Sequence, residues 1–241
     1  MNNLVVCGCS FSDRTKVPRA WGDYLAESLG YSYTHFAGGS GSDHRGIRLL
    51  TQAIMQGKVD THSLVIFQLT GVERCELPSQ LNTSVRNNHG IATVERTWLG
   101  NYVSKFKMHS HTWQECKFDK NAHLQHEEWL VDEDFHAEEL FALHYSLVEL
   151  CKSKTIKICY ISHKNNGFIW HLQHLLKNVE QRVNPLEYMI GDRYFENPWS
   201  EDEMVKWGLA PDDQAHLSTE GHIAFAKTIQ GWLREERIIN E

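Results

Sequence analysis

Short apolar runs alternate with amphipathic segments along the first third of the chain. Residues 4–7 form an apolar run that ends at Gly8, as expected for a buried strand followed by a tight turn. Residues 31–36 and 64–69 form two further strand-like runs. Apolar residues at helical spacing separate the three runs, at Ala20, Tyr24, Leu25 and Leu29 and then at Ile47, Leu50 and Ile54. The pattern predicts strand, turn and helix twice over, followed by a third strand.

The regular pattern stops after the third strand and resumes later. From about residue 75 to about 135 the chain is polar and shows neither strand nor helix periodicity, so we expect an insertion or cap there. Regularity returns with a predicted helix at about 137–152, a β-branched strand at 155–162 and an amphipathic helix at about 169–179. A loose segment at 184–207 follows. The last predicted helix has its apolar face at Ile223, Phe225, Ala226, Ile229 and Leu233.

Alternating strands and helices predict an α/β fold, in which helices cover both faces of a central parallel sheet in a three-layer α/β/α sandwich. The chain has 241 residues, and a single hydrophobic core can grow to about 250 residues. We therefore expect residues 1–241 to form one domain, with the insertion or cap at about 75–135.

Composition and charge exclude several classes of function. The formal net charge is −7 and no dense Lys/Arg block occurs, which argues against nucleic-acid binding. The chain shows no signal peptide and no apolar run long enough to span a membrane, so we expect a cytoplasmic protein. Its six cysteines are widely spaced, which predicts reduced thiols, with Cys7, Cys151 and Cys159 in the core.

Ser10 follows the first predicted strand by two residues. In a parallel α/β sheet, functional residues gather at the carboxyl ends of the strands. Gly8 permits a close turn there, and the start of the following helix can aim N–H groups at an anion beside Ser10. The alternative is that Ser10 and Ser12 only cap a helix.

The far end of the chain supplies a base for such a hydroxyl. Asp213 and His216 lie three residues apart in a predicted loop just before the final helix. A histidine can take the proton of a serine near neutral pH, and a carboxylate on its other nitrogen fixes the tautomer. The spacing lets Asp213 reach His216 across one turn. The alternative is that Asp213 and Ser218 are caps and His216 is a solvated loop residue.

These two segments resemble blocks of the SGNH/GDSL hydrolase family. Residues Gly8-Cys-Ser-Phe-Ser12 resemble its G-D-S-x-[ST] block, with Cys9 in place of Asp. Residues 213–222 resemble its D-x-x-H-P-x-x-x-G-H block, with Leu217 in place of Pro. Trp21, Leu25, Leu29 and Gly30 also match positions at which the family carries W, L and L-G. The resemblance in the arrangement of motifs, strands and helices covers about residues 1–75 and 137–235.

The resemblance implies a flavodoxin-like SGNH fold and a triad of Ser10, His216 and Asp213. Asp212 and His222 are the second choices for the acid and the base. The triad implies hydrolysis of a small-molecule or glycan-linked acyl ester through an acyl-enzyme, without a cofactor. An acyltransferase with the same triad, or a catalytically silent module that binds a glycan or a protein, are the alternatives.

The resemblance also implies an oxyanion hole, and here the chain departs from the family. The expected donors are the Ser10 N–H and a glycine N–H, for which Gly39 is the first choice and Gly41 the second. The family's third donor, an asparagine after the third strand, is absent from the run Gln68 to Arg74. Possible substitutes are Thr70, Arg74, Asn165 and Asn166. Arg74 is alternatively a ligand for an anionic group of the substrate, or part of a surface ion pair with Glu73 or Glu76.

Other clusters in the sequence carry less weight. The insertion contains four histidines near Cys116, at His109, His111, His123 and His126. Their spacing matches no zinc finger, so we expect no metal. Aromatic residues of the insertion could line an acyl pocket or form a small local core: Trp98, Tyr102, Phe106, Trp113, Phe118 and Trp129. The glycine-rich turn at 38–41 lacks the lysine of a phosphate-binding loop.

Overall fold

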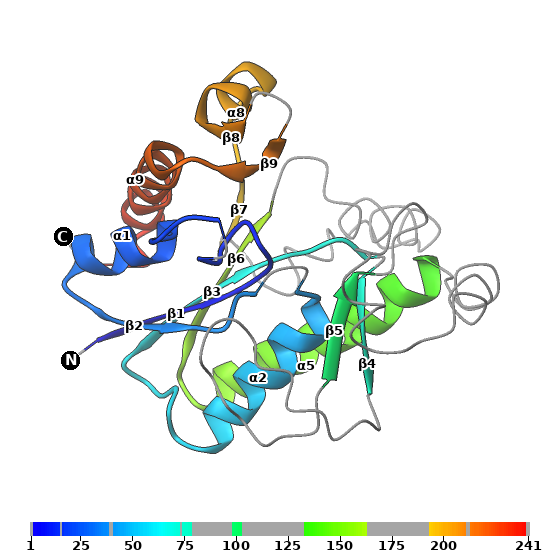
Figure 1. The fold of residues 1–241 in the computed structure, drawn as a ribbon. Coiled ribbons are helices and arrows are strands. Elements are labelled where there is room, and N and C mark those ends of the chain that lie inside the picture. The colour runs from blue at the N-terminus through cyan, green and yellow to red at the C-terminus, as the bar shows by residue number, and fades with distance from the viewer. Residues whose placement is uncertain are drawn as a thin grey trace, which may run out of the picture.

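The structure is a computed structural model that describes residues 2–14, 16–38, 41–72, 74–78, 98–102, 133–162, 193–210 and 213–239. Within these residues a five-stranded sheet has the order β2-β1-β3-β6-β7, and all its neighbouring strands are parallel (Figure 1). The strands are β1 (Asn3–Cys7), β2 (Ser32–His35), β3 (Ser63–Gln68), β6 (Lys157–Ser162) and β7 (Tyr194–Glu196).

Helices cover both faces of this sheet. Helices α1 (Trp21–Leu29) and α9 (Thr219–Glu235) lie on one face, and α2 (Asp43–Met55) and α5 (Glu133–Ser153) lie on the other (Figure 1). Because successive residues of a strand point to opposite faces, Leu4 and Val6 pack with α1 and α9, whereas Val5 and Cys7 pack with α2 and α5. The predicted three-layer α/β/α sandwich is confirmed.

The strand order changes direction at β1. From β1 the chain moves to β2 on one side, whereas β3, β6 and β7 follow on the other side. In an open parallel sheet, such a change of direction leaves a crevice outside the carboxyl ends of the two diverging strands. The segment after β1 begins at Gly8, and the segment after β3 begins at Leu69. The topology therefore predicts a crevice where the sequence places Ser10.

Two antiparallel hairpins lie outside the main sheet. Strands β4 (Arg74–Pro78) and β5 (Trp98–Tyr102) belong to the predicted insertion. Strands β8 (Gly208–Ala210) and β9 (Asp213–Leu217) form the second hairpin, after helix α8 (Glu201–Trp207). The rest of the predicted insertion up to residue 132, with its histidine cluster, and the predicted helix at 169–179 lie outside the described residues.

Three segments differ from the sequence prediction. Strand β6 begins at Lys157 rather than 155, because Thr155 takes a left-handed φ of 54° and the Ile156 N–H still closes α5 by donating to the Cys151 carbonyl (2.9 Å). The segment 184–207, predicted to be loose, contains β7 and α8. Residues 213–216, predicted to be a loop, belong to strand β9.

The core of the described residues contains cysteines with free thiols. Cys7, Cys9, Cys151 and Cys159 are free and buried. Burial raises the thiol pKa of Cys151 and Cys159 to about 12, so both stay protonated near neutral pH. None of the helices in the described ranges is long and apolar enough to cross a membrane.

The close approach of α2 to the sheet yields a stability prediction. A Cβ at Gly46 would lie 2.7 Å from the ring of Phe67, which is fully buried, whereas a Cβ at Gly231 of α9 would meet nothing within 4 Å. Gly46→Ala should lower the free energy of unfolding by about 1–3 kcal/mol through overpacking. The matched Gly231→Ala should raise it by about 0.5–1 kcal/mol, because alanine favours a helix interior. Urea unfolding measures both, and equal effects of the two changes would contradict the packing of α2.

Candidate active site

The turn after β1 is held from beneath by a buried glutamine. Gln68 Oε1, at the end of β3, accepts hydrogen bonds from Ser12 Oγ (2.6 Å) and from the Cys9 N–H (3.4 Å). A Cβ at Gly8, where φ is +156°, would lie 2.6 Å from the same oxygen, so only glycine fits. The Ser12 N–H closes the turn on the Cys9 carbonyl (3.0 Å). This turn leaves Ser10, at its tip, half-buried.

The glycine-rich segment before α2 docks against the same turn. The Gly38 N–H donates to the Gly8 carbonyl (3.2 Å), and the Gly41 N–H donates to the Gly38 carbonyl (2.9 Å). A Cβ at Gly41 would approach the Gly8 carbonyl to 2.8 Å. The small residues predicted to flank the oxyanion site therefore permit close backbone contact between the two turns.

His216 is held at the corner between β9 and α9. The next residue, Leu217, is fully buried, and Ser218 caps α9 by accepting from the Gly221 N–H (3.1 Å). The Ser218 N–H donates to the Trp207 carbonyl (2.8 Å), and a Cβ at Gly221 would come within 2.3 Å of that carbonyl. These contacts fix the backbone on the carboxyl side of His216.

A polar contact at the candidate site joins residues from the two ends of the chain. His216 Nε2 lies 3.0 Å from Ser10 Oγ, within hydrogen-bond distance, although the two residues are 206 positions apart in sequence. Both residues are half-buried. The structure therefore brings together the hydroxyl and the imidazole that the sequence predicts as nucleophile and base.

The other predicted site residues are placed to different degrees. Asp213 opens β9 and Arg74 opens β4, and the structure describes these two residues only as strand positions. Asp213 and His216 were expected to meet across a turn, but they belong to a strand whose pairing with β8 is irregular. The residues that fall outside the described part of the chain are Gly39, Asn165, Asn166 and Asp212.

The backbone amides of two residues predicted for the oxyanion hole have acceptors within the protein. The Thr70 N–H donates to Asp43 Oδ1 (2.9 Å), and the Gly41 N–H donates to the Gly38 carbonyl. The Ser10 N–H, in contrast, donates to no acceptor among the described residues. Of these three backbone amides, that of Ser10 is the one left to bind an oxyanion.

A buried polar chain behind the site was not recognised in the sequence. Asp43, the first residue of α2, places Oδ2 3.1 Å from His144 Nε2, and His144 Nδ1 lies 3.1 Å from the Tyr160 hydroxyl. All three side chains are at most 1% exposed, and Phe67 packs edge-on against the His144 ring. This chain ties α2, α5 and β6 to the Thr70 segment. A sequence signal existed only for Asp43, because an acidic residue favours the first turn of a helix.

Breaking this chain should be costly. We predict that His144→Leu lowers the free energy of unfolding by about 3–5 kcal/mol, because the Asp43 carboxylate loses its buried partner. Adding Asp43→Asn should then cost much less than it does in the wild type, since the two groups act on each other. Urea unfolding of the single and double variants measures this coupling. The exposed His62→Leu serves as the control, and strictly additive losses would contradict the contact.

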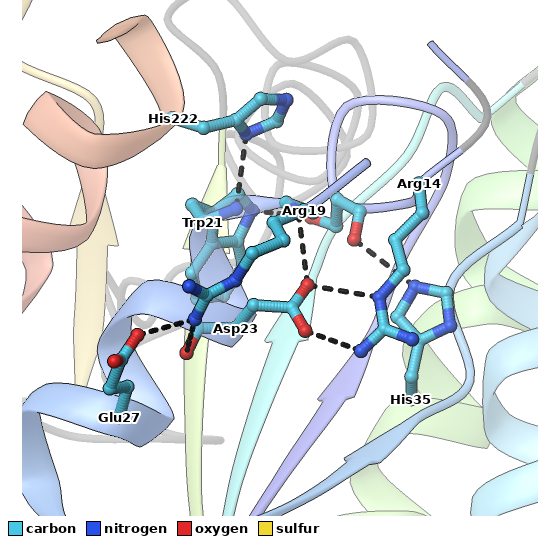
Figure 2. Close-up of polar contacts among 9 residues, drawn as sticks. Arg14, Arg19, Trp21, Asp23, Glu27, His35 and His222 are labelled. Atoms are coloured by element: carbon cyan, nitrogen blue, oxygen red, sulfur yellow. Dashed lines mark hydrogen bonds and ion pairs between the residues drawn. The ribbon is translucent and has the colours of Figure 1, made fainter. Parts of the chain in front are cut away.

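Figure 2 shows which side chains accept hydrogen bonds from the N–H groups at the amino end of α1. The N-cap residue Ala20 has no side-chain acceptor, so Asp23 Oδ2 accepts from the Ala20 N–H (3.0 Å) and His222 Nδ1 accepts from the Trp21 N–H (3.1 Å). Arg14 Nε holds the same Asp23 oxygen at 2.9 Å. His222, the second choice for the base, is thus engaged with α1, whereas His216 faces Ser10.

Burial lowers the pKa of His222 to about 4, from an ordinary value near 6.5. Asp13 and Asp23 oppose the shift and His216 adds to it. Because the unfolded chain binds this proton more tightly, the stabilisation from neutral His222 is complete above about pH 6.5 and is lost as the pH falls through 4.

His222→Asn keeps an acceptor for the Trp21 N–H but does not titrate. Between pH 7 and pH 4 it should therefore lose about 3 kcal/mol less stability than the wild type. Urea unfolding at the two pH values checks this difference, with the exposed His62→Asn as control. Equal acid sensitivity of wild type and His222→Asn would contradict the buried, neutral imidazole.

No protein-family model and no curated protein matches the chain. Solved structures do. Esterase EstA from Pseudoalteromonas sp., in a structure inhibited by monoethylphosphonate, matches with a TM-score of 0.54 at 8% identity, over 99% of this chain and 100% of EstA. The YxiM protein of Bacillus subtilis matches with a TM-score of 0.51 at 10% identity, over 100% of this chain and 58% of its own length.

At such low identities these matches show the fold alone. They establish that the described sheet and its helices belong to an α/β architecture that EstA also has. The chain spans little more than half the length of the YxiM protein. What the site does must be argued from its own geometry.

Proposed function

We propose that this chain is a serine ester hydrolase of the SGNH/GDSL type, with Ser10 as nucleophile and His216 as general base. The observation that carries the proposal is the 3.0 Å approach of His216 Nε2 to Ser10 Oγ at the carboxyl edge of the sheet. The likeness of the fold to that of an esterase, EstA, supports it. The two sequence blocks that resemble the family contain these same two residues.

In the proposed reaction, His216 Nε2 accepts the Ser10 hydroxyl proton as Oγ attacks the ester carbonyl. The resulting imidazolium protonates the departing alkoxide, which leaves Ser10 acylated. A water molecule then gives its proton to Nε2 and attacks the acyl carbonyl, and the carboxylic acid is released with the hydroxyl restored. Asp213 is the proposed carboxylate partner of the imidazole.

The Ser10 N–H is the proposed first oxyanion donor, because it has no acceptor among the described residues. Gly39 supplies the proposed second donor. Gly41 and Thr70 could serve with their backbone amides only if these left their present acceptors, Gly38 and Asp43. Arg74 is proposed to contact the substrate, which is a small-molecule or glycan-linked acyl ester.

Ser10→Ala tests the assignment directly. Turnover of p-nitrophenyl acetate should fall by at least about a thousandfold, because the atom that forms the acyl bond is lost. Ser146→Ala, an exposed serine of α5, is the control and should keep wild-type turnover. Unchanged turnover in Ser10→Ala would refute the proposed nucleophile. Product analysis with added alcohol or amine acceptors separates hydrolysis from acyl transfer.

A second candidate function is a catalytically silent binding module on the same scaffold. It is favoured by the internal hydrogen bonds of the Gly41 and Thr70 amides, which leave fewer donors for an oxyanion. A fluorophosphonate probe distinguishes the two candidates, since it labels only an activated serine. Mass spectrometry should find the adduct on Ser10 if the chain is a hydrolase, and on no residue if it is a silent module.

A further inference from the structure

Besides the Ser10–His216 pair, a second hydrogen bond joins the two ends of the chain. His222 Nδ1 accepts from the Trp21 N–H at 3.1 Å, and the two residues are 201 positions apart. Trp21 is fully buried and His222 is 2% exposed, so water does not compete for either group. The bond lies inside the contact between α1 and α9 (Figure 2).

Trp21 is also tied to the nucleophile turn. Its indole Nε1 donates to Ser12 Oγ (2.9 Å), which in turn donates to Gln68 Oε1 (2.6 Å). The same oxygen accepts from the Cys9 N–H. A continuous series of hydrogen bonds therefore runs from the turn that carries Ser10, through one tryptophan, to His222.

His222 in turn is tied to the backbone that carries His216. It lies in the first turn of α9, and its N–H donates to the Ser218 carbonyl (2.9 Å), two residues after His216. Phe11, the neighbour of Ser10, packs against the ring of His222 with centroids 6.5 Å apart. A rotation or shift of the first turn of α9 would therefore move His216 relative to Ser10.

We infer that His222 is a positioning residue for the proposed reaction: by accepting the Trp21 N–H, it sets the distance between His216 Nε2 and Ser10 Oγ. The expected effect on kcat rests on the proposed function, whereas the expected effect on the distance between Ser10 Oγ and His216 Nε2 does not. The role requires a neutral imidazole with an unprotonated Nδ1. It also explains why Ala20 can stand at the N-cap of α1, since His222 supplies the acceptor for the first turn.

Two substitutions at His222 separate the effect of its hydrogen-bond acceptor from the effect of its side-chain volume. His222→Leu fills similar space without an acceptor, and His222→Asn keeps an oxygen at the position of Nδ1. His222→Leu should lower kcat for p-nitrophenyl acetate by about tenfold to a hundredfold with KM changed less than about twofold, because a displacement of about 1 Å has this effect on positioned groups. His222→Asn should restore kcat to within about threefold of wild type.

Phe225→Leu is the matched packing control. Phe225 lies on the same face of α9 and contacts Trp21 and Phe11, edge to face, at 5.9 Å and 5.1 Å between ring centroids. It should lower the melting temperature and leave kcat within about threefold of wild type, since the Trp21–His222 bond remains. Equal losses of kcat in His222→Leu and Phe225→Leu, or no rescue by asparagine, would overturn the inference.

Crystal structures of the wild type and the two His222 variants keep this test independent of the proposed function. A wild type that neither hydrolyses the ester nor reacts with the fluorophosphonate refutes the proposed hydrolase. The distance from Ser10 Oγ to His216 Nε2 then decides the inference alone. We expect it to exceed about 3.5 Å in His222→Leu and to stay within hydrogen-bond range in His222→Asn. A distance unchanged from the wild type in His222→Leu would overturn the positioning role.

Discussion

The packing of α1 against α9 is the contact on which the candidate site depends. Ser10 follows the first strand and His216 precedes the last helix, so they meet only where these two helices lie side by side. Full burial of a large apolar side chain contributes about 1.5–3 kcal/mol, and this contact buries Trp21, Leu25, Phe225 and Ile229. A single hydrogen bond contributes about 1 kcal/mol net. Apolar burial therefore brings the two chain ends together, and the hydrogen bonds set their geometry.

The opposite face of the sheet contains a buried polar chain in addition to its apolar contacts. Asp43 and His144 form a buried pair between α2 and α5, and the Asp43 carboxylate also holds the Thr70 N–H. Such a pair tolerates few alternative arrangements, because either group alone in the core is strongly unfavourable. The segments after β1 and β3 are thus held by different means: Gln68 lies beneath the first, and Asp43 lies beside the second.

Local patterns in the sequence predict the architecture better than they predict the contacts. The apolar runs at 4–7 and 64–69 correspond to β1 and β3, because a parallel strand that is buried on both faces has an almost continuously apolar sequence. Strand β7 has only three residues and weak alternation, so periodicity alone does not reveal it. The pairing of Ser10 with His216 is predicted from the family resemblance. The partners of Asp43, His144 and His222 depend on tertiary packing, and no spacing in the sequence encodes them.

The order of strands and helices along the chain has a consequence for the synthesis and folding of the protein. A ribosome synthesises the five strands of the central sheet, and the serine turn with them, before it reaches β9 and α9. A domain generally folds as a unit. A chain still attached at that stage has the hydroxyl but not the imidazole that faces it, and the first turn of α1 has not yet received its acceptor from His222. The site is therefore complete only after α9 has been synthesised and has packed against α1.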